Sequence, residues 1–234
     1  MFRYFTLTLI LLSTSVRAAI IFDGSANPTT EGWTEIGLGG VVSTDGNIFT
    51  VNTVGLPDSG GTSPYDLFKY SAPQLTTGGY TIEARLKTSG STFNQLDGGA
   101  TLMVGGNATG AGDTAARSDM ILFSNTSVMW GDLSHSYSVD TTQYHVYDLT
   151  VDNAGVATFY VDGTAALTRT GYTTSGIISF GDQTNDAGVN GRMDIDYISI
   201  GAVPEPASAS LMVIGCTFCL LSRRRGSAGN RVWV

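Results

Sequence analysis

The segment from Tyr80 to Lys87 alternates strictly between apolar and polar side chains. In an extended chain Ile82, Ala84 and Leu86 lie on one face, and the charged residues between them lie on the other. The same period of two recurs along the chain, interrupted by Gly, Asn, Asp and Ser, and no segment between residues 19 and 202 has a helical period. We therefore predict an all-β fold, an antiparallel β-sandwich of the jelly-roll kind, with a barrel as the alternative.

About a dozen segments carry this strand pattern. They are Ile20–Phe22, Asn47–Asn52, Asp66–Tyr70, Tyr80–Lys87, Thr101–Val104, Asp119–Ser124, Ser127–Trp130, Tyr144–Val151, Val156–Val161, Thr164–Thr168, Gly176–Phe180 and Arg192–Ile200. Turn signals separate them. Asp152-Asn153-Ala154-Gly155 predicts one hairpin turn and Asp162-Gly163 the next, because asparagine and glycine accept positive φ angles.

The first eighteen residues have the order of an export signal. Arg3 provides a positive start, and Phe5 to Leu12 form an apolar segment. Val16-Arg17-Ala18 then places small residues at the positions that a signal peptidase reads. We expect residues 1–18 to be a signal peptide and Ala19 to begin the mature protein.

The C-terminal segment carries a second targeting pattern. Two prolines enclose Glu205, Ala207–Leu221 is apolar, and a run of arginines follows. The apolar stretch has 15 residues, somewhat fewer than the roughly 20 that span a bilayer, and the arginines would stay on the cytoplasmic side. This order resembles the PEP-CTERM sorting signal of exported bacterial proteins, on Val203, Pro204, Glu205, Pro206, Arg223, Arg224 and Arg225. The resemblance implies a transmembrane helix within residues 203–225 and sorting by an exosortase-type membrane protease. Residues 226–234 form a further short tail, which departs from the pattern because such signals usually end sooner after the arginines.

Residues 19–202 remain as the exported part, which is long enough for one domain with a substantial core. This part has nineteen acidic and six basic residues, and its net charge is therefore −13. Such a charge repels nucleic acid and anionic lipid, whereas it suits cations and neutral glycans. Both cysteines, Cys216 and Cys219, lie in the apolar tail segment, so the domain is expected to be held by its core without a disulfide.

The strands also resemble those of a known fold family. After Tyr80–Lys87 come Tyr144-x-x-Tyr147-x-Leu149-x-Val151, then Tyr160-Val161-Asp162-Gly163, and a closing Asp196-Tyr197-Ile198. Over residues 65–200 this order is similar to the concanavalin A-like lectin and glucanase sandwich, close to laminin G-like modules. The resemblance implies two curved antiparallel sheets with a concave side that faces glycans.

The same resemblance implies a structural calcium ion that bridges the first and last strands. Asp23, the carbonyl of Gly24 and Asp196 are the residues that would hold it, since calcium takes carboxylate and carbonyl oxygens. Strict alternation places Asp196 on the inward face with Ile198, where a carboxylate is costly unless it is paired or metal-bound. The alternative is that these aspartates are ordinary turn residues, or that Asp196 accepts backbone N–H bonds.

Aromatic rings in loops are a second kind of candidate, because the C–H faces of sugars stack on them. Trp33, Trp130, Tyr137 and Tyr172 lie in or beside expected loops. From these we name Trp33, Trp130 and Tyr137 as candidate ligand-binding residues, although tryptophan is also a common core anchor.

The sequence does not predict catalysis. The glucanases of this fold class use two glutamates in a Glu-x-Asp-x-x-Glu pattern, and residues 19–202 contain Glu31, Glu35 and Glu83 without that spacing. Asp119 and Asp132 are the remaining candidates, but nothing in the sequence pairs them. We therefore expect a protein that is not an enzyme.

These features predict an exported protein, first anchored in the membrane as a precursor and then held at the cell surface or in the extracellular matrix. Its sandwich domain is expected to bind extracellular polysaccharide without cleaving it. Two alternatives stay open: a secreted glycoside hydrolase of the same fold, and a purely structural protein associated with exopolysaccharide.

Overall fold

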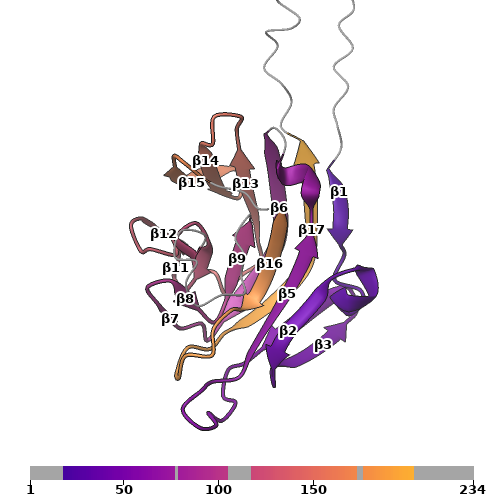
Figure 1. Cartoon of the computed structure of the whole chain (residues 1–234), viewed down its shortest axis with the longest axis vertical. Coiled ribbons are helices and arrows are strands. Elements are labelled where there is room, and N and C mark those ends of the chain that lie inside the picture. Colours follow the sequence, from indigo (N-terminus) through magenta and orange to yellow (C-terminus); the bar gives the residue numbers. More distant parts are fainter. Residues whose placement is uncertain (1–17, 77–78, 105–116, 173–175, 203–234) are drawn as a thin grey trace, which may run out of the picture. The chain divides into compact units, whose positions relative to one another are not determined.

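The computed structural model describes residues 18–76, 79–104, 117–172 and 176–202, and within them the chain forms two large antiparallel β-sheets (Figure 1). The predicted all-β sandwich is thereby confirmed. Apart from Ala18, the predicted signal peptide and the sorting tail lie outside the described residues. Within the described ranges, no helix is long and apolar enough to cross a membrane.

The larger sheet has eight strands. Its order is β15 (Thr164–Arg169), β14 (Ala157–Val161), β13 (His145–Val151), β6 (Tyr80–Ser89), β17 (Arg192–Ala202), β4 (Ile48–Asn52) and β3 (Val41–Asp45), and β1 (Ala19–Phe22) also pairs with β17. One edge of β17 is therefore shared between β4, at residues 192–195, and β1, at residues 198–200. The expectation that the first and last strands lie side by side is confirmed.

The smaller sheet has seven strands. Its order is β12 (Ser136–Ser138), β11 (Ser127–Trp130), β10 (Ile121–Phe123), β9 (Thr101–Val104), β16 (Ile177–Asp182), β5 (Tyr65–Ser71) and β2 (Thr34–Leu38). A short hairpin, β7 (Phe93–Asn94) and β8 (Asp97–Gly98), and two 3₁₀ turns, η1 (Pro28–Glu31) and η2 (Pro73–Thr76), connect the main strands. Figure 1 shows β5, β16 and β9 side by side in one sheet and β6 beside β17 in the other.

The main-sheet strands that the sequence pattern missed are β2, β3 and β12. All three lie at the edges of the two sheets. An edge strand buries little of its surface, so it needs no strict alternation of apolar and polar residues. The sequence pattern missed these strands because it depends on burial, and the burial of a strand depends on its position in the sheet.

The core lies between the sheets and is rich in aromatic rings. Phe180 of β16 stacks on Phe68 of the same sheet and on Phe22 of the opposite sheet, with ring centroids 5.4 and 5.6 Å apart. Trp33 and Phe49 contact the same ring at 5.0 and 6.2 Å. All five side chains are at most 3% exposed, so this cluster joins both sheets at the β1 side of the sandwich.

A β-bulge interrupts β17 at Asp196. Ile195 lies opposite Leu86 and Tyr197 lies opposite Arg85, so Asp196 is the extra residue. The bulge shifts the inward face from Met193 and Ile195 to Ile198 and Ile200, which are all buried. The prediction that Asp196 shares the inward face of Ile198 was therefore wrong, because it assumed an uninterrupted period of two.

The core contains a buried polar atom without a partner among the described residues, the hydroxyl of Tyr147. Tyr147 is fully buried between the rings of Phe123 and Phe159, and its hydroxyl has no hydrogen-bond partner within the described part of the chain. Tyr147→Phe keeps the ring contacts and removes the unpaired group, so we expect it to raise the free energy of unfolding by about 1 kcal/mol. Tyr147→Ala should lower it by about 3–5 kcal/mol. Urea denaturation measures both; a loss of stability in Tyr147→Phe would show that the hydroxyl has a partner.

Candidate functional site

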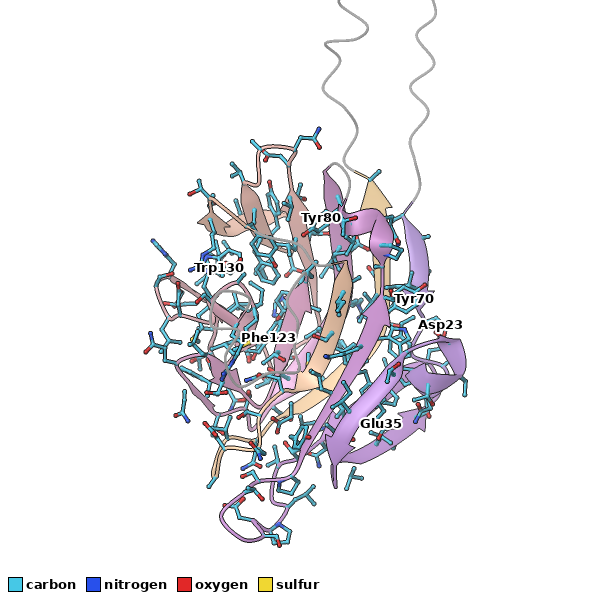
Figure 2. All side chains as sticks on the ribbon, in the orientation of Figure 1. Asp23, Glu35, Tyr70, Tyr80, Phe123 and Trp130 are labelled. Carbon is cyan, nitrogen blue, oxygen red and sulfur yellow. The ribbon has the colours of Figure 1, made fainter. Side chains whose placement is uncertain are left out.

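A pocket of about 220 Å³ opens at the end of the sandwich where β6 begins. Figure 2 marks this end by Tyr80. The lining combines aromatic rings with small polar side chains: Leu75, Thr76, Tyr80, Val151, Asp152, Asn153, Gly155 and Tyr172. We refer to it as the Tyr80 pocket.

Strand register brings the parts of the Tyr80 pocket together. Val151 at the end of β13 lies opposite Tyr80 at the start of β6, so the β13–β14 turn lies beside the first residue of β6. Within that turn Asp152 Oδ1 accepts hydrogen bonds from the backbone N–H groups of Ala154 (2.9 Å) and Val156 (2.8 Å). The turn is therefore held by its own aspartate, and the exposed Asn153 lies at its tip.

The two tyrosines of the pocket are almost completely buried. Tyr80 is 3% exposed and Tyr172 is 5% exposed. The Tyr172 hydroxyl donates to the Val104 carbonyl oxygen at 2.8 Å, whereas the Tyr80 hydroxyl has no partner among the described residues. Burial raises the pKa of both phenols above the usual value, so both remain neutral hydrogen-bonding groups. The exposed polar groups of the pocket are therefore those of Thr76, Asp152 and Asn153, and the two tyrosines are its buried lining.

The two candidate tryptophans lie in the core and not at the surface. Trp33 is 3% exposed, and its ring N–H donates to the Ile21 carbonyl oxygen at 3.2 Å. Trp130, labelled in Figure 2, is fully buried, and the guanidinium of Arg169 lies 5.1 Å from its ring centroid. The structure therefore corrects the expectation that these rings lie in loops open to sugars. Tyr137 is half-buried at the edge strand β12, and sugar binding there stays a prediction.

Arg169 brings together the two aspartates that the sequence could not pair. Its guanidinium bonds to Asp119 Oδ1 at 2.7 Å and also contacts Asp132 Oδ2, in ion pairs whose side chains are mostly buried. Burial raises the pKa of Asp132, but hydrogen bonds from Ser134 and Arg169, together with the Arg169 charge, outweigh it and hold the pKa below its usual value. One arginine that pairs with both carboxylates gives these two aspartates a structural role.

Of the three residues that the resemblance suggested for calcium, Gly24 lies against the backbone of Asp196. A β-carbon on Gly24 would lie 2.5–2.7 Å from the carbonyl oxygens of Asn47, Ile195 and Asp196, so this corner requires glycine. The carboxylates, however, are engaged elsewhere. Asp196 forms an ion pair with Arg85, and Asp23 Oδ1 accepts hydrogen bonds from Ser25.

These contacts bear on the calcium ion that the resemblance implied. A guanidinium beside Asp196 occupies the carboxylate with a positive charge of its own, which does not suit a second cation. Among the described residues no group of three or more His, Cys, Asp or Glu side chains could hold a metal ion. The residues at this corner therefore fit an ion pair better than a calcium site.

Glu83 and Asp148 form a carboxylate pair that sequence analysis missed. They lie directly opposite each other on β6 and β13, and the Tyr197 hydroxyl donates to Glu83 Oε1 at 2.6 Å. Burial, and next the charge of Glu83, raise the pKa of Asp148 to about 6. Only the register of the two strands could have revealed this pair, because the residues are far apart in the sequence.

No protein-family model matches the sequence, and neither does any curated protein. Solved structures do resemble the fold. The exoplasmic/lumenal domain of VIP36, in a metal-free form, matches with a TM-score of 0.51 at 13% identity over 80% of this chain and 92% of that one. A carbohydrate esterase of the Shiga toxin-encoding bacteriophage phi24B matches with a TM-score of 0.50 at 16% identity, over 79% of this chain and 98% of that one. At these identities the likenesses show the fold alone, an antiparallel β-sandwich of the kind found in these two proteins.

The carboxylate pair makes stability depend on pH. Because the pKa of Asp148 is raised in the folded state, its contribution favours folding below about pH 4 and is lost as the pH rises to about 6. Asp148→Asn cannot ionise, so above pH 6 we expect it to be more stable than the wild type, on the order of 1 kcal/mol. Melting temperatures at pH 4 and pH 7.5 measure this, with the exposed Asp45→Asn as control. If the melting temperatures of Asp148→Asn and the wild type differed by the same amount at both pH values, ionisation of Asp148 would not be the cause of the pH dependence.

Proposed function

We propose that this protein is exported and sorted to the cell surface or extracellular matrix, where its sandwich domain binds neutral extracellular polysaccharide without cleaving it. The Tyr80 pocket is the observation that carries the proposal. Sugars are recognised by hydroxyl, amide and carboxylate groups, and this pocket gathers the exposed Thr76, Asp152 and Asn153 from η2 and the β13–β14 turn. The buried rings of Tyr80 and Tyr172 lie beneath them. The net charge of −13 on residues 19–202 favours a neutral glycan over an anionic one.

The fold is consistent with this use. The similar structures include a carbohydrate esterase, so sandwiches of this type act on carbohydrates in other proteins. The export signal at residues 1–18 and the PEP-CTERM-like tail at residues 203–225 would deliver the domain to the outside, where an exosortase-type protease is the expected partner. A purely structural role in exopolysaccharide differs from this proposal only in lacking a specific ligand.

A glycoside hydrolase is the second candidate, and the Glu83–Asp148 pair is the observation that favours it. The two carboxylates are directly opposite, and the raised pKa of Asp148 is a property of general acids. Neither residue, however, lines the Tyr80 pocket. The pair lies on a sheet surface that also carries the Arg85–Asp196 ion pair, and we therefore assign it to sheet stability rather than to catalysis.

A glycan array probed with the labelled full-length chain tests the binding proposal. We expect binding to neutral glycans, and Asn153→Ala should weaken it about tenfold, because one good hydrogen bond to a ligand is worth roughly 1.4 kcal/mol. Asn153 is exposed at a turn tip, so the variant should keep the wild-type melting temperature. The matched control is Asn125→Ala in the exposed β10–β11 turn, outside the pocket, which should bind normally.

Three outcomes would count against this function. Absence of binding on the array favours the purely structural role. Equal binding by Asn153→Ala and the wild type would place the ligand outside the Tyr80 pocket. Release of reducing sugar that disappears in Glu83→Gln would establish the hydrolase instead.

Processing at both ends tests export and sorting. We expect protein isolated from the cell surface to begin at Ala19 and to lack the apolar segment Ala207–Leu221, since the leader and the tail are read by separate proteases. Mass spectrometry of intact surface protein measures both ends. Surface protein that still carries Arg223–Arg225 would argue against exosortase cleavage, and a variant with Pro204 and Pro206 changed to Ala is the expected uncleaved control.

A further inference from the structure

A second pocket, of about 280 Å³, opens at the start of β5, whereas the Tyr80 pocket lies beyond the end of that strand. We refer to it as the Tyr65 pocket. Figure 1 shows the loop that leads into β5 at the far end of the sandwich from the β13–β14 turn. Prolines, one tyrosine and small polar residues form the lining, which includes Pro57, Ser59, Thr62, Pro64, Tyr65 and Asn185.

The position of Tyr65 in β5 directs its ring away from the core. Asp66, opposite Asp182 of β16, and Phe68 are both buried. Phe68 belongs to the core between the sheets, and side chains an odd number of positions apart in a strand point to opposite faces. The Tyr65 ring is therefore on the outer face, where it is half-buried.

The loop that forms one wall of the Tyr65 pocket has a fixed turn at its tip. Ser59 and Thr62 exchange backbone hydrogen bonds of 2.9 and 3.2 Å. Gly60 and Gly61 between them have φ angles of 64° and 85°, and positive φ at both positions is what a tight two-residue hairpin requires.

Ser63 joins this loop to the one that follows β16. Its backbone N–H donates to the Asn185 carbonyl oxygen at 2.9 Å, and its hydroxyl oxygen accepts a hydrogen bond from the Gly188 N–H at 3.0 Å. The two walls are thus connected before any ligand arrives. A site that is already ordered avoids part of the entropy cost of binding.

The lining of the Tyr65 pocket contains no charged side chain. Asp58 lies in the same loop, but its carboxylate accepts a hydrogen bond from the Ser63 hydroxyl at 2.6 Å. An anion would find no cationic partner in the lining, and a metal ion would find no carboxylate there. These features favour a neutral ligand.

The lining also combines rings with free polar groups. The prolines and Tyr65 supply apolar ring surface, and Ser59 and Asn185 are exposed. Within the described ranges, the side-chain amide of Asn185 and the hydroxyl of Tyr65 form no hydrogen bond, so both are open to a ligand. A sugar matches this combination, because its C–H face packs on rings while its hydroxyl groups need donors and acceptors at the edge.

We propose that the Tyr65 pocket is a second binding site for a neutral sugar, with the Asn185 amide as a hydrogen-bonding group. The inference rests on the proposed function and extends it, since the sandwich would hold polysaccharide at both ends. The seven residues of β5 span about 20 Å, so a short oligosaccharide cannot fill both pockets. Two sites on one domain can grip one long chain twice or join two chains, and either arrangement strengthens attachment to a polymer.

Isothermal titration calorimetry of the full-length chain tests the proposal. The probes are neutral trisaccharides of β-linked glucose, α-linked glucose and α-linked mannose. We expect two sugars to bind per chain. Asn185→Ala should weaken one binding event about tenfold and Asn153→Ala the other, because each removes one hydrogen bond to the ligand. Both side chains are exposed, so both variants should keep the wild-type melting temperature, and the control Asn125→Ala should still bind two sugars.

The outcomes separate this inference from the proposed function. One sugar per chain, with binding weakened by Asn153→Ala and unchanged by Asn185→Ala, would overturn the second site and leave the Tyr80 pocket as the glycan site. Binding that responds only to Asn185→Ala would support the Tyr65 pocket and count against the Tyr80 pocket. Two binding events that are both unchanged in Asn185→Ala would overturn the Tyr65 assignment. Absence of binding to all three probes would overturn both sites.

Discussion

The contacts of Phe180 hold the two sheets of this domain together. Its ring packs against Phe22 and Phe49 from the larger sheet, against Phe68 from its own sheet, and against Trp33 just before β2, and all of these rings are buried. A domain without a disulfide depends on such burial, and aromatic rings bury more area per residue than aliphatic side chains. Burial of the Trp33 ring against Phe180 stabilises the fold, and it leaves the ring closed to a sugar.

The bulge at Asp196 shows how one extra residue reorganises a strand. On its N-terminal side β17 pairs with β4, and on its C-terminal side the same edge pairs with β1. Gly24 fits against the carbonyl oxygens at this junction because it has no side chain. The bulge also releases Asp196 from the inward face, so that it can pair with Arg85 on the outer surface. Asp196, predicted as a metal ligand, thus forms an ion pair because the extra residue in β17 moves its side chain to the other face of the sheet.

The sequence predicted what alternation and turn chemistry control. The strands Tyr80–Ser89, His145–Val151 and Ala157–Val161, the turn at Asp152 to Gly155 and the meeting of the first and last strands were all expected, and the structure contains them. It could not predict contacts that depend on register between distant strands. The opposition of Glu83 to Asp148, and of Asp66 to Asp182, arises only after the sheets form, because each pair joins residues more than sixty positions apart.

The Tyr80 pocket and the buried aspartates Asp66 and Asp182 lie at opposite ends of the same strands. Asp66 lies near the start of β5, whereas the end of β5 leads into η2 beside the Tyr80 pocket. Ala202, the last residue of β17, lies opposite Tyr80, so the pocket lies beside the end of the last strand that the structure describes. The exposed polar groups of the pocket are therefore separated from the buried carboxyl groups by the length of β5.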